Sequence, residues 1–245
     1  ENLAGKLFLL VEIESRKTEN LKLINFLIET FNHNYYQNEK MILRERVKGV
    51  KIEHIFESAV AKTNKNLAEF ISAEKIKLDY QSINATVGVI YENSLNFSSV
   101  GKNKAILIYP HRIGMGIYPL TPARAGIYPD KIRRPEDGAA GAAKYKMVDI
   151  VTRSGYAETG KNKDGGTKDA ANKLFSNVLS GSIPAGGYFI FSNEVLPEYL
   201  SAKQLIEIIT TLPPAGAAEQ IKNSLSKINY YVSFLGLIIK NTAGI

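Results

Sequence analysis

Basic side chains gather in one part of this 245-residue sequence, and they are its first candidates for chemistry. The chain carries 31 Lys and Arg against 24 Asp and Glu, and 11 against 7 of these lie between residues 110 and 169. Such a segment can bind phosphate groups or an anionic surface. The residues singled out for anion binding are Arg112, Arg124, Arg133 and Arg134. The alternative is a solvated loop, because few aromatic rings that could stack on bases are interleaved with the charges.

Residue type and spacing exclude several other kinds of chemistry. Cysteine is absent, which excludes thiolate metal sites, cysteine nucleophiles and disulfides, and fits a reducing, cytoplasmic setting. The three histidines, His33, His54 and His111, lack the HxH or HExxH spacing of zinc sites. The glycines near residue 160 do not fit a phosphate-binding loop between a strand and a helix. No apolar run approaches the length of a membrane helix.

Apolar patterns along the chain predict the elements that would have to position any site. Single strands are predicted at residues 5–13, 145–151, 188–192 and 232–240. The first of these is apolar enough for the middle of a covered sheet. Helices are predicted from Thr18 to about residue 33, at 53–72, at 201–212 with a capping box of Ser201 and Gln204, and at 217–228. Antiparallel strands with helices in pairs indicate an α+β fold.

The stretch from Ile83 to Tyr109 contains three strand-like runs separated by residues that tolerate turns. It predicts a three-stranded antiparallel meander. In its second run, Leu95 and Phe97 alternate with Asn96 and Ser98, so we expect one face of the meander to be buried.

Residues 110–170 differ in composition from the rest of the chain, because proline, glycine and alanine are frequent there. This composition predicts an irregular basic insertion rather than a core element. We expect a single domain over residues 1–245 around this insertion. The sequence starts at Glu1 with neither a methionine nor a signal-like segment, so we also expect it to be trimmed from a longer chain.

Several short blocks carry a resemblance to a known family. They are Ala59–Leu67, Asn84–Thr86, Phe97–Lys104, Ser180–Ile183, Phe191–Leu196 and Tyr230–Ser233. In order and spacing, these blocks resemble those of the PP2C, or PPM, serine/threonine phosphatases. That family has a helix with an Ala-Asn pair, then Gly-Thr-Thr, Val-Gly-Asp-Ser-Arg, Ser/Thr-Asp-Gly and a final Asp-Asn/Asp-x-Thr. The similarity covers nearly the whole chain outside residues 110–170.

The resemblance implies a fold and a place for the chemistry. The fold would be an α-β-β-α sandwich, in which two packed antiparallel sheets carry a helix pair on each outer face. Active members of the family bind two Mg²⁺ or Mn²⁺ ions through aspartates at strand ends. Hard cations need such carboxylate oxygens, and the bridged ions supply the hydroxide that attacks phosphorus.

This sequence departs from the family at each metal-binding position. Glu12 matches the first Asp-Gly, Asn193 and Glu194 match the Ser/Thr-Asp-Gly, and Tyr230 matches the final aspartate. Gly101–Lys104 replaces the Gly-Asp-Ser-Arg block and adds positive charge. An amide is a weak neutral ligand, and a phenol at neutral pH is none. The arginine that binds phosphate ahead of the family's first Asp-Gly also has no counterpart.

We therefore interpret the chain as a degenerate, inactive PP2C-like member, a pseudophosphatase domain that acts in protein interaction, scaffolding or regulation. We expect no cofactor and a protein partner, either separate or the remainder of a longer chain, and neither nucleic acid nor membrane as partner. One alternative is an active phosphatase with Mg or Mn held by Glu12, Glu14 and Glu194. If these residues bind no metal, Glu12 is an ordinary carboxylate at the end of a strand, and Glu194 is an exposed carboxylate in a turn. A further alternative is an anionic-surface binder that uses the four arginines.

Overall fold

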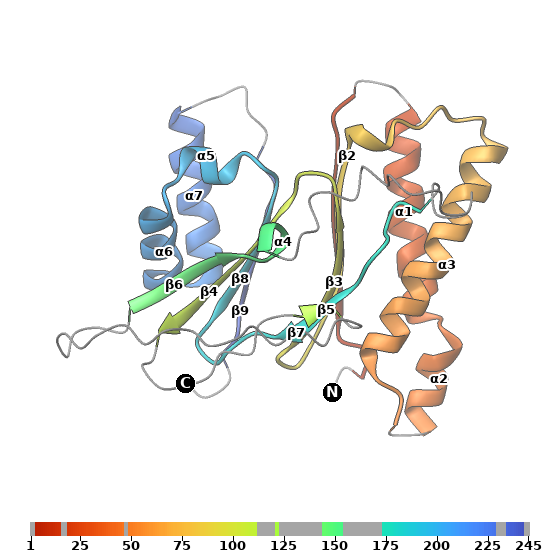
Figure 1. The fold of residues 1–245 in the computed structure, drawn as a ribbon, viewed down its shortest axis with the longest axis horizontal. Coiled ribbons are helices and arrows are strands. Elements are labelled where there is room, and N and C mark those ends of the chain that lie inside the picture. Colours follow the sequence, from red (N-terminus) through yellow and green to blue (C-terminus); the bar gives the residue numbers. More distant parts are fainter. Residues whose placement is uncertain are drawn as a thin grey trace.

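Two antiparallel β-sheets lie face to face, and helices cover the outer side of each (Figure 1). The computed structural model describes residues 3–15, 19–46, 49–111, 121–122, 144–153, 173–228 and 234–242. The strand order is β1-β2-β3-β7-β5 in the first sheet and β6-β4-β8-β9 in the second. All of the pairings are antiparallel. The predicted α-β-β-α arrangement is therefore confirmed.

The bounds of the elements are as follows. The first sheet consists of β1 (Lys6–Ile13), β2 (Ile83–Tyr91), β3 (Ser94–Val100), β7 (Leu179–Ser182) and β5 (Thr121–Pro122). The second consists of β6 (Lys144–Asp149), β4 (Lys104–His111), β8 (Tyr188–Ser192) and β9 (Gly236–Lys240). The longer helices are α1 (Glu19–Tyr36), α2 (Glu39–Arg46), α3 (Ile52–Ala73), α6 (Ala202–Thr211) and α7 (Pro214–Ile228). Single turns are η1 (Tyr80–Ser82), α4 (Ile150–Arg153) and α5 (Leu196–Tyr199).

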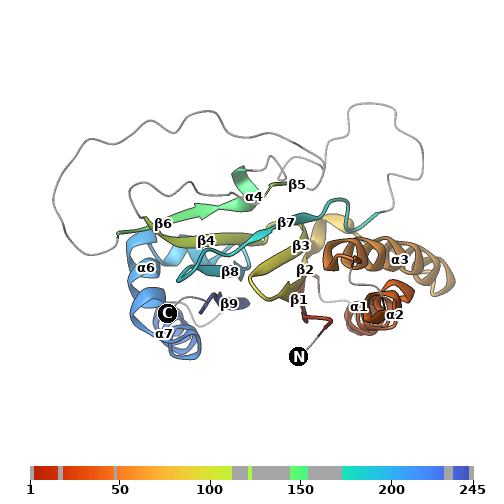
Figure 2. The same cartoon turned by 90° about the horizontal axis from the view of Figure 1, so that it is seen from below.

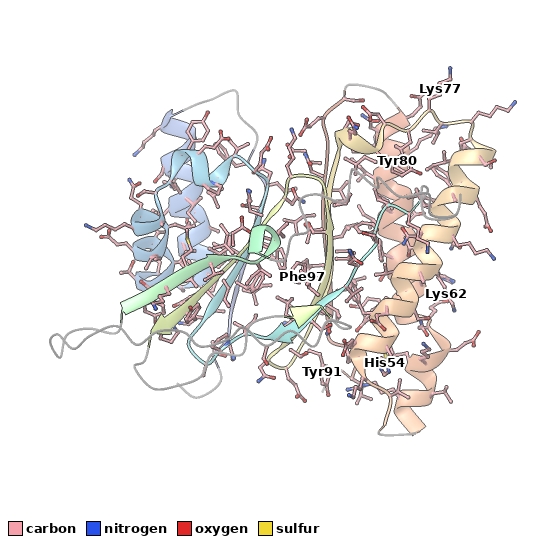
Figure 3. The ribbon with its side chains drawn as sticks, in the orientation of Figure 1. His54, Lys62, Lys77, Tyr80, Tyr91 and Phe97 are labelled. Carbon is pink, nitrogen blue, oxygen red and sulfur yellow. The ribbon has the colours of Figure 1, made fainter. Side chains whose placement is uncertain are left out.

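Side chains on the strands alternate between separate apolar cores, as the period of two in a strand requires. Val87 and Val89 of β2 face α1 and α3, whereas Phe97 of β3 points into the core between the sheets (Figure 3). In the second sheet, Leu107 of β4 joins this central core, and Ile108 faces α6 and α7. Each sheet is therefore buried on both of its faces, which fixes its register strongly.

The predicted meander of three strands is wrong at its third strand. β2 and β3 form a hairpin in the first sheet, but β4 belongs to the second sheet, where it lies between β6 and β8. The chain changes sheet at Gly101, whose φ of +78° is open to glycine but costly for other residues. A side chain there would also overlap the backbone of Ile83 and Asn84. In the second sheet, β4 is covered on one face by the first sheet and on the other by α6 and α7.

The expected burial of the face that carries Leu95 and Phe97 is confirmed, but the opposite face of this hairpin is buried as well. Asn96 and Ser98 are only 2% and 1% exposed, because the segment that precedes β7 covers this part of the sheet. In that segment Asn177 accepts a hydrogen bond from Ser98 through its backbone carbonyl. Asn64 of α3 holds the same segment, since its side-chain amide exchanges two hydrogen bonds of 2.6 and 3.0 Å with the backbone of Phe175. Paired polar groups of this kind can be buried at little net cost.

Other differences are smaller. β1 forms an edge of its sheet rather than the middle. Residues 179–182 form strand β7 rather than a turn, and helix α2 was not predicted at all. Ile28 is 50% exposed, and Ala218 is exposed while Ala217 is buried. The capping box of Ser201 and Gln204 at the start of α6 is confirmed. None of the helices in the described ranges combines the length and hydropathy of a membrane span.

Two leucines of α1 provide a test of this packing. Leu27 is fully buried against α3 and the first sheet, whereas Leu21 in the same helix is 65% exposed. We expect Leu27→Ala to lower the free energy of unfolding by about 2–5 kcal/mol, because it removes buried methyl groups and leaves a cavity. The matched variant Leu21→Ala should change it by less than about 0.5 kcal/mol. Urea denaturation of both variants measures the difference, and equal losses would contradict the layer arrangement.

Candidate functional site

The candidate site lies where the chain passes between the two sheets. Glu14 follows β1 in the first sheet, Glu194 follows β8 in the second, and Lys102 lies in the connection from β3 to β4. The Lys102 ammonium lies 3.2 and 3.4 Å from the two carboxylate oxygens of Glu14, and 3.2 Å from Oε1 of Glu194. It therefore bridges carboxylates that belong to opposite sheets.

A buried amide fixes one side of this bridge. Asn84, at the start of β2, is 2% exposed. Its side-chain nitrogen donates to Glu14 Oε1 at 2.7 Å, and its side-chain oxygen accepts from the backbone N–H of Lys102 at 2.8 Å. Gly101 allows this close approach, because an added Cβ would lie against the Asn84 oxygen. The amide thus positions both the lysine and one of its carboxylates.

The charges at the site stabilise one another. Hydrogen bonds from Asn84 and Lys102 lower the pKa of Glu14 below its ordinary value of 4.5, since both donors favour the ionised form. The hydrogen bonds to Glu14 and Glu194 raise the pKa of Lys102 above 10.5. All three side chains are about half exposed, at 50%, 41% and 39% for Lys102, Glu14 and Glu194. The network is therefore accessible to solvent, and each pair in it contributes little free energy.

A second polar pair lies beside the bridge. The Asn193 side chain, from the end of β8, donates to Glu12 Oε2 at 3.5 Å, and Asn193 itself is 2% exposed. The sequence therefore identified two residues that the fold brings together from positions 181 apart in the chain. Glu12 and Glu194 approach the site from opposite sheets, as the resemblance implies.

Buried hydroxyls and amides lie behind these residues. Asn103 donates to Thr86 Oγ1 at 3.1 Å, and Thr86 in turn shares a hydrogen bond of 2.9 Å with Ser99. Within the described ranges, the side-chain oxygens of Asn103 and Ser192 accept or donate no hydrogen bond although they are buried. These polar side chains replace what would otherwise be an apolar end of the central core.

The residues present do not fit a pair of divalent cations. Two such ions held together need several carboxylates whose charges remain available. Here the Lys102 ammonium pairs with both Glu14 and Glu194, so the three side chains together keep a net charge of only −1, and Asn193 directs its amide nitrogen, which cannot ligate, toward Glu12. In the described part of the chain, no three acidic or histidine side chains are grouped as metal ligands. A cation would have to displace the lysine before it could use these carboxylates.

Several predicted site residues lie outside the described residues. They are Tyr230 and the four candidate anion-binding residues Arg112, Arg124, Arg133 and Arg134. Most of the predicted insertion over 110–170 also lies there. His54 is described and lies on α3, away from this site (Figure 3). Sequence reasoning noted the positive charge of Lys102 but missed its bridging position, which depends on the change of sheet at Gly101.

Comparison with known proteins places the fold. No family model and no curated protein sequence matches the chain. Solved structures match over nearly its whole length. PppA, described as a key regulatory component of the T6SS in Pseudomonas aeruginosa, has a TM-score of 0.55 and 8% identity over 97% of this chain and 86% of its own. The serine/threonine phosphatase PstP/Ppp of Mycobacterium tuberculosis has a TM-score of 0.53 and 11% identity over 95% and 86%.

A third match is the serine-threonine phosphatase 2C of Toxoplasma gondii, with a TM-score of 0.51 and 9% identity over 95% of this chain and 83% of that one. Matches of this extent show that the chain has the PP2C-like fold. At such low identity they show the fold alone, so the chemistry has to be argued from the side chains at the site.

The ion-pair bridge predicts a pH-dependent contribution to stability. We expect Lys102→Met to lower the free energy of unfolding at pH 7 by no more than about 1 kcal/mol, as for other exposed ion pairs. Because the pKa of Glu14 is lowered in the folded state, this contribution is present above its unfolded pKa of 4.5 and is lost as the pH falls through the folded value. Because the pKa of Lys102 is raised, the contribution is also lost as the pH rises through a folded value above 10.5.

Urea denaturation at pH 3 and 7 measures the acidic part of this dependence, and a measurement above pH 10.5 measures the alkaline part. Lys62→Met is the matched control, since Lys62 is an exposed lysine of α3 remote from the bridge (Figure 3). A difference between the two variants that stayed constant from pH 7 to pH 3 would contradict the bridge.

Proposed function

We propose that this chain is a noncatalytic PP2C-like domain that acts by binding a protein partner. The observation that carries the proposal is the position of the Lys102 ammonium between Glu14 and Glu194, at 3.2 Å from each. The ammonium of this half-exposed lysine occupies the place where a divalent ion would have to contact these carboxylates. The resemblance places Lys102 at the aspartate of the family's Gly-Asp-Ser-Arg block, so one substitution both removes a ligand and adds a competing charge.

The second half of the site supports the same proposal. The amide of Asn193 faces Glu12, and an amide brings no negative charge to offset that of a metal ion. With Lys102 and Asn193 in these positions, the described site lacks the excess of negative charge that holds two divalent cations close together. A domain that keeps this fold without such a site can still present its surfaces to other proteins.

A regulatory role on this fold has a precedent in PppA, whose description names it a regulatory component. We therefore extend the proposal to regulation or scaffolding, in a cytoplasmic setting that agrees with the absence of cysteine. Anion binding by Arg112, Arg124, Arg133 and Arg134 and a phosphatase activity with Mg or Mn are the competing functions. The second of these is decided by the experiment below.

Metal titration and a phosphatase assay test the proposal directly. We expect the unmodified chain to show no micromolar Mn²⁺ binding by calorimetry and no Mn²⁺-dependent release of phosphate from a phosphothreonine peptide. Two Mn²⁺ ions bound at micromolar concentration, together with phosphate release, would refute the noncatalytic function.

A single substitution tests the role of the lysine in this result. Lys102→Asp removes the internal cation and adds a carboxylate between Glu14 and Glu194, so we expect it to bind Mn²⁺ at least about tenfold more tightly than the unmodified chain. Lys102→Ala removes the cation without adding a ligand and should fall between the two. The control is Lys104→Asp, which makes the same change of charge at a lysine that pairs with Asp149 at 3.6 Å instead. Equal Mn²⁺ affinities for the two aspartate variants would show that Lys102 does not block the site.

A further inference from the structure

Strand β9 forms an edge of the second sheet. Among the described residues it pairs with β8 on one side and with no strand on the other. Just before β9 the Leu235 carbonyl accepts from the Asn193 N–H at 3.1 Å, and just after it the Asn241 N–H donates to the Gly187 carbonyl at 3.0 Å. Backbone groups along an antiparallel strand point alternately toward and away from the partner. The N–H and C=O groups of Gly236, Ile238 and Lys240 therefore point away from β8, along the edge.

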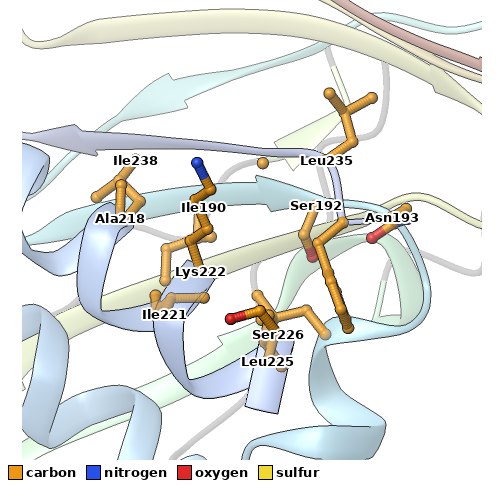
Figure 4. A pocket seen from close by; sticks show the side chains of 13 residues that line it. Ile190, Ser192, Asn193, Ala218, Ile221, Lys222, Leu225, Ser226, Leu235 and Ile238 are labelled. Carbon is orange, nitrogen blue, oxygen red and sulfur yellow. The ribbon is translucent and has the colours of Figure 1, made fainter. Parts of the chain in front are cut away.

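A cavity of about 410 Å³ lies beside this edge, between the sheet and α7 (Figure 4). Most of its lining is aliphatic or aromatic, including Ile190, Leu196, Ile221, Leu225, Phe234 and Ile238. A volume of this size can accept a large apolar side chain. The cavity lies on the face of β9 that carries Ile238, which is the same face toward which the side chains of an added strand would point on every second residue.

One polar atom in the cavity wall lacks a partner. Ser192 of β8 is 2% exposed and lines the cavity, and its hydroxyl makes no hydrogen bond to any described residue. It pairs with Gly236 of β9, which has no side chain to cover it. This hydroxyl is a polar point in a lining that otherwise favours an apolar group.

The charges around the cavity are positive. Lys222 of α7 lines it and is exposed, and Lys240 extends over the ring of Tyr188 at 5.4 Å on the same face of the sheet. Within the described ranges, no carboxylate lies at ion-pair distance from either lysine. Lysines on an edge strand oppose pairing with an identical edge, and they attract an acidic segment instead.

We propose that the β9 edge binds an extended, acidic segment of a partner protein, which adds to the second sheet as a further strand. The backbone groups of Gly236, Ile238 and Lys240 supply its hydrogen bonds, one of its apolar side chains enters the cavity, and an acidic side chain faces Lys222. Strand addition gives affinity through the backbone and specificity through such pockets. This inference rests on the proposed binding function and names its surface and the chemistry of its partner.

Peptide binding tests this inference. The probe is a fluorescein-labelled nine-residue peptide in which every second residue is leucine or glutamate in turn and the residues between them are threonine, so that leucine and glutamate share one face of the strand. Fluorescence anisotropy measures its dissociation constant. Gly236→Pro removes an edge N–H donor, and proline is tolerated at the start of an edge strand. We expect this variant to bind the peptide at least about tenfold more weakly. It loses one backbone hydrogen bond, and the proline ring prevents the close approach of the added strand at this position. The matched control is Gly236→Ala, which keeps the donor and whose Cβ would make only an ordinary contact with Phe191.

A charge-reversed variant gives an independent measurement. Lys222→Glu should weaken binding of the acidic peptide by about three- to tenfold, and it should strengthen binding of a second peptide in which lysine replaces glutamate. Lys203→Glu is the control, because Lys203 is exposed on α6 and does not line the cavity, and the net charge changes equally. Thermal melting of each variant shows whether it is folded.

Three results of these measurements would overturn the inference, and a fourth is given below. They are no binding of the acidic peptide by the unmodified chain, equal binding by the proline and alanine variants, and self-association of the free chain that only Gly236→Pro abolishes. The last result would assign the edge to a second copy. The fourth result is binding of the peptide with an affinity that neither Gly236→Pro nor Lys222→Glu changes. It would assign the cavity to a small apolar ligand and would also refute strand addition. None of these results depends on Mn²⁺ or phosphate release, so failure of this inference is distinguishable from failure of the proposed function.

Discussion

The contact of Lys102 with two carboxylates from opposite sheets joins the two halves of the site. A lysine ammonium and a divalent ion would compete for the same carboxylate oxygens. The backbone N–H of Lys102 donates to the Asn84 side chain, and this hydrogen bond positions the lysine between the carboxylates. Glu12, Glu14 and Glu194 together carry −3 against +1 from Lys102, so the site keeps a net charge of −2.

This position exists because the chain leaves one sheet and enters the other at Gly101. The connection between β3 and β4 spans the space between the sheets, and its side chains therefore meet residues from the ends of both. In the second sheet, β4 has apolar side chains on both faces and is covered on both. The same architecture leaves β9 as an edge, with α7 and a cavity beside it.

Much of the fold follows from local pattern. The helices α1, α3, α6 and α7 and the strands β1, β8 and β9 were predicted from period and capping, because those signals lie within a few residues of each other. The pairing of β4 was not predicted correctly, because a strand that follows a short turn can either form a hairpin or enter another sheet. Asn96 and Ser98 show a related limit. Alternation suggested that they are exposed, but they are buried because a segment about eighty residues later covers them.

The sequence by itself determined the inventory of the site: one or two acids at each strand end, an amide at Asn193, and lysine where the resemblance requires aspartate. It also determined the layered α+β fold, because periodicity and block order are properties of the chain alone. Only the tertiary structure decided which of these groups meet. Glu14, Lys102 and Glu194 are 88 and 92 residues apart in sequence, and their interaction depends on the packing of two sheets. A distance between charges is set by that packing, and composition carries no information about it.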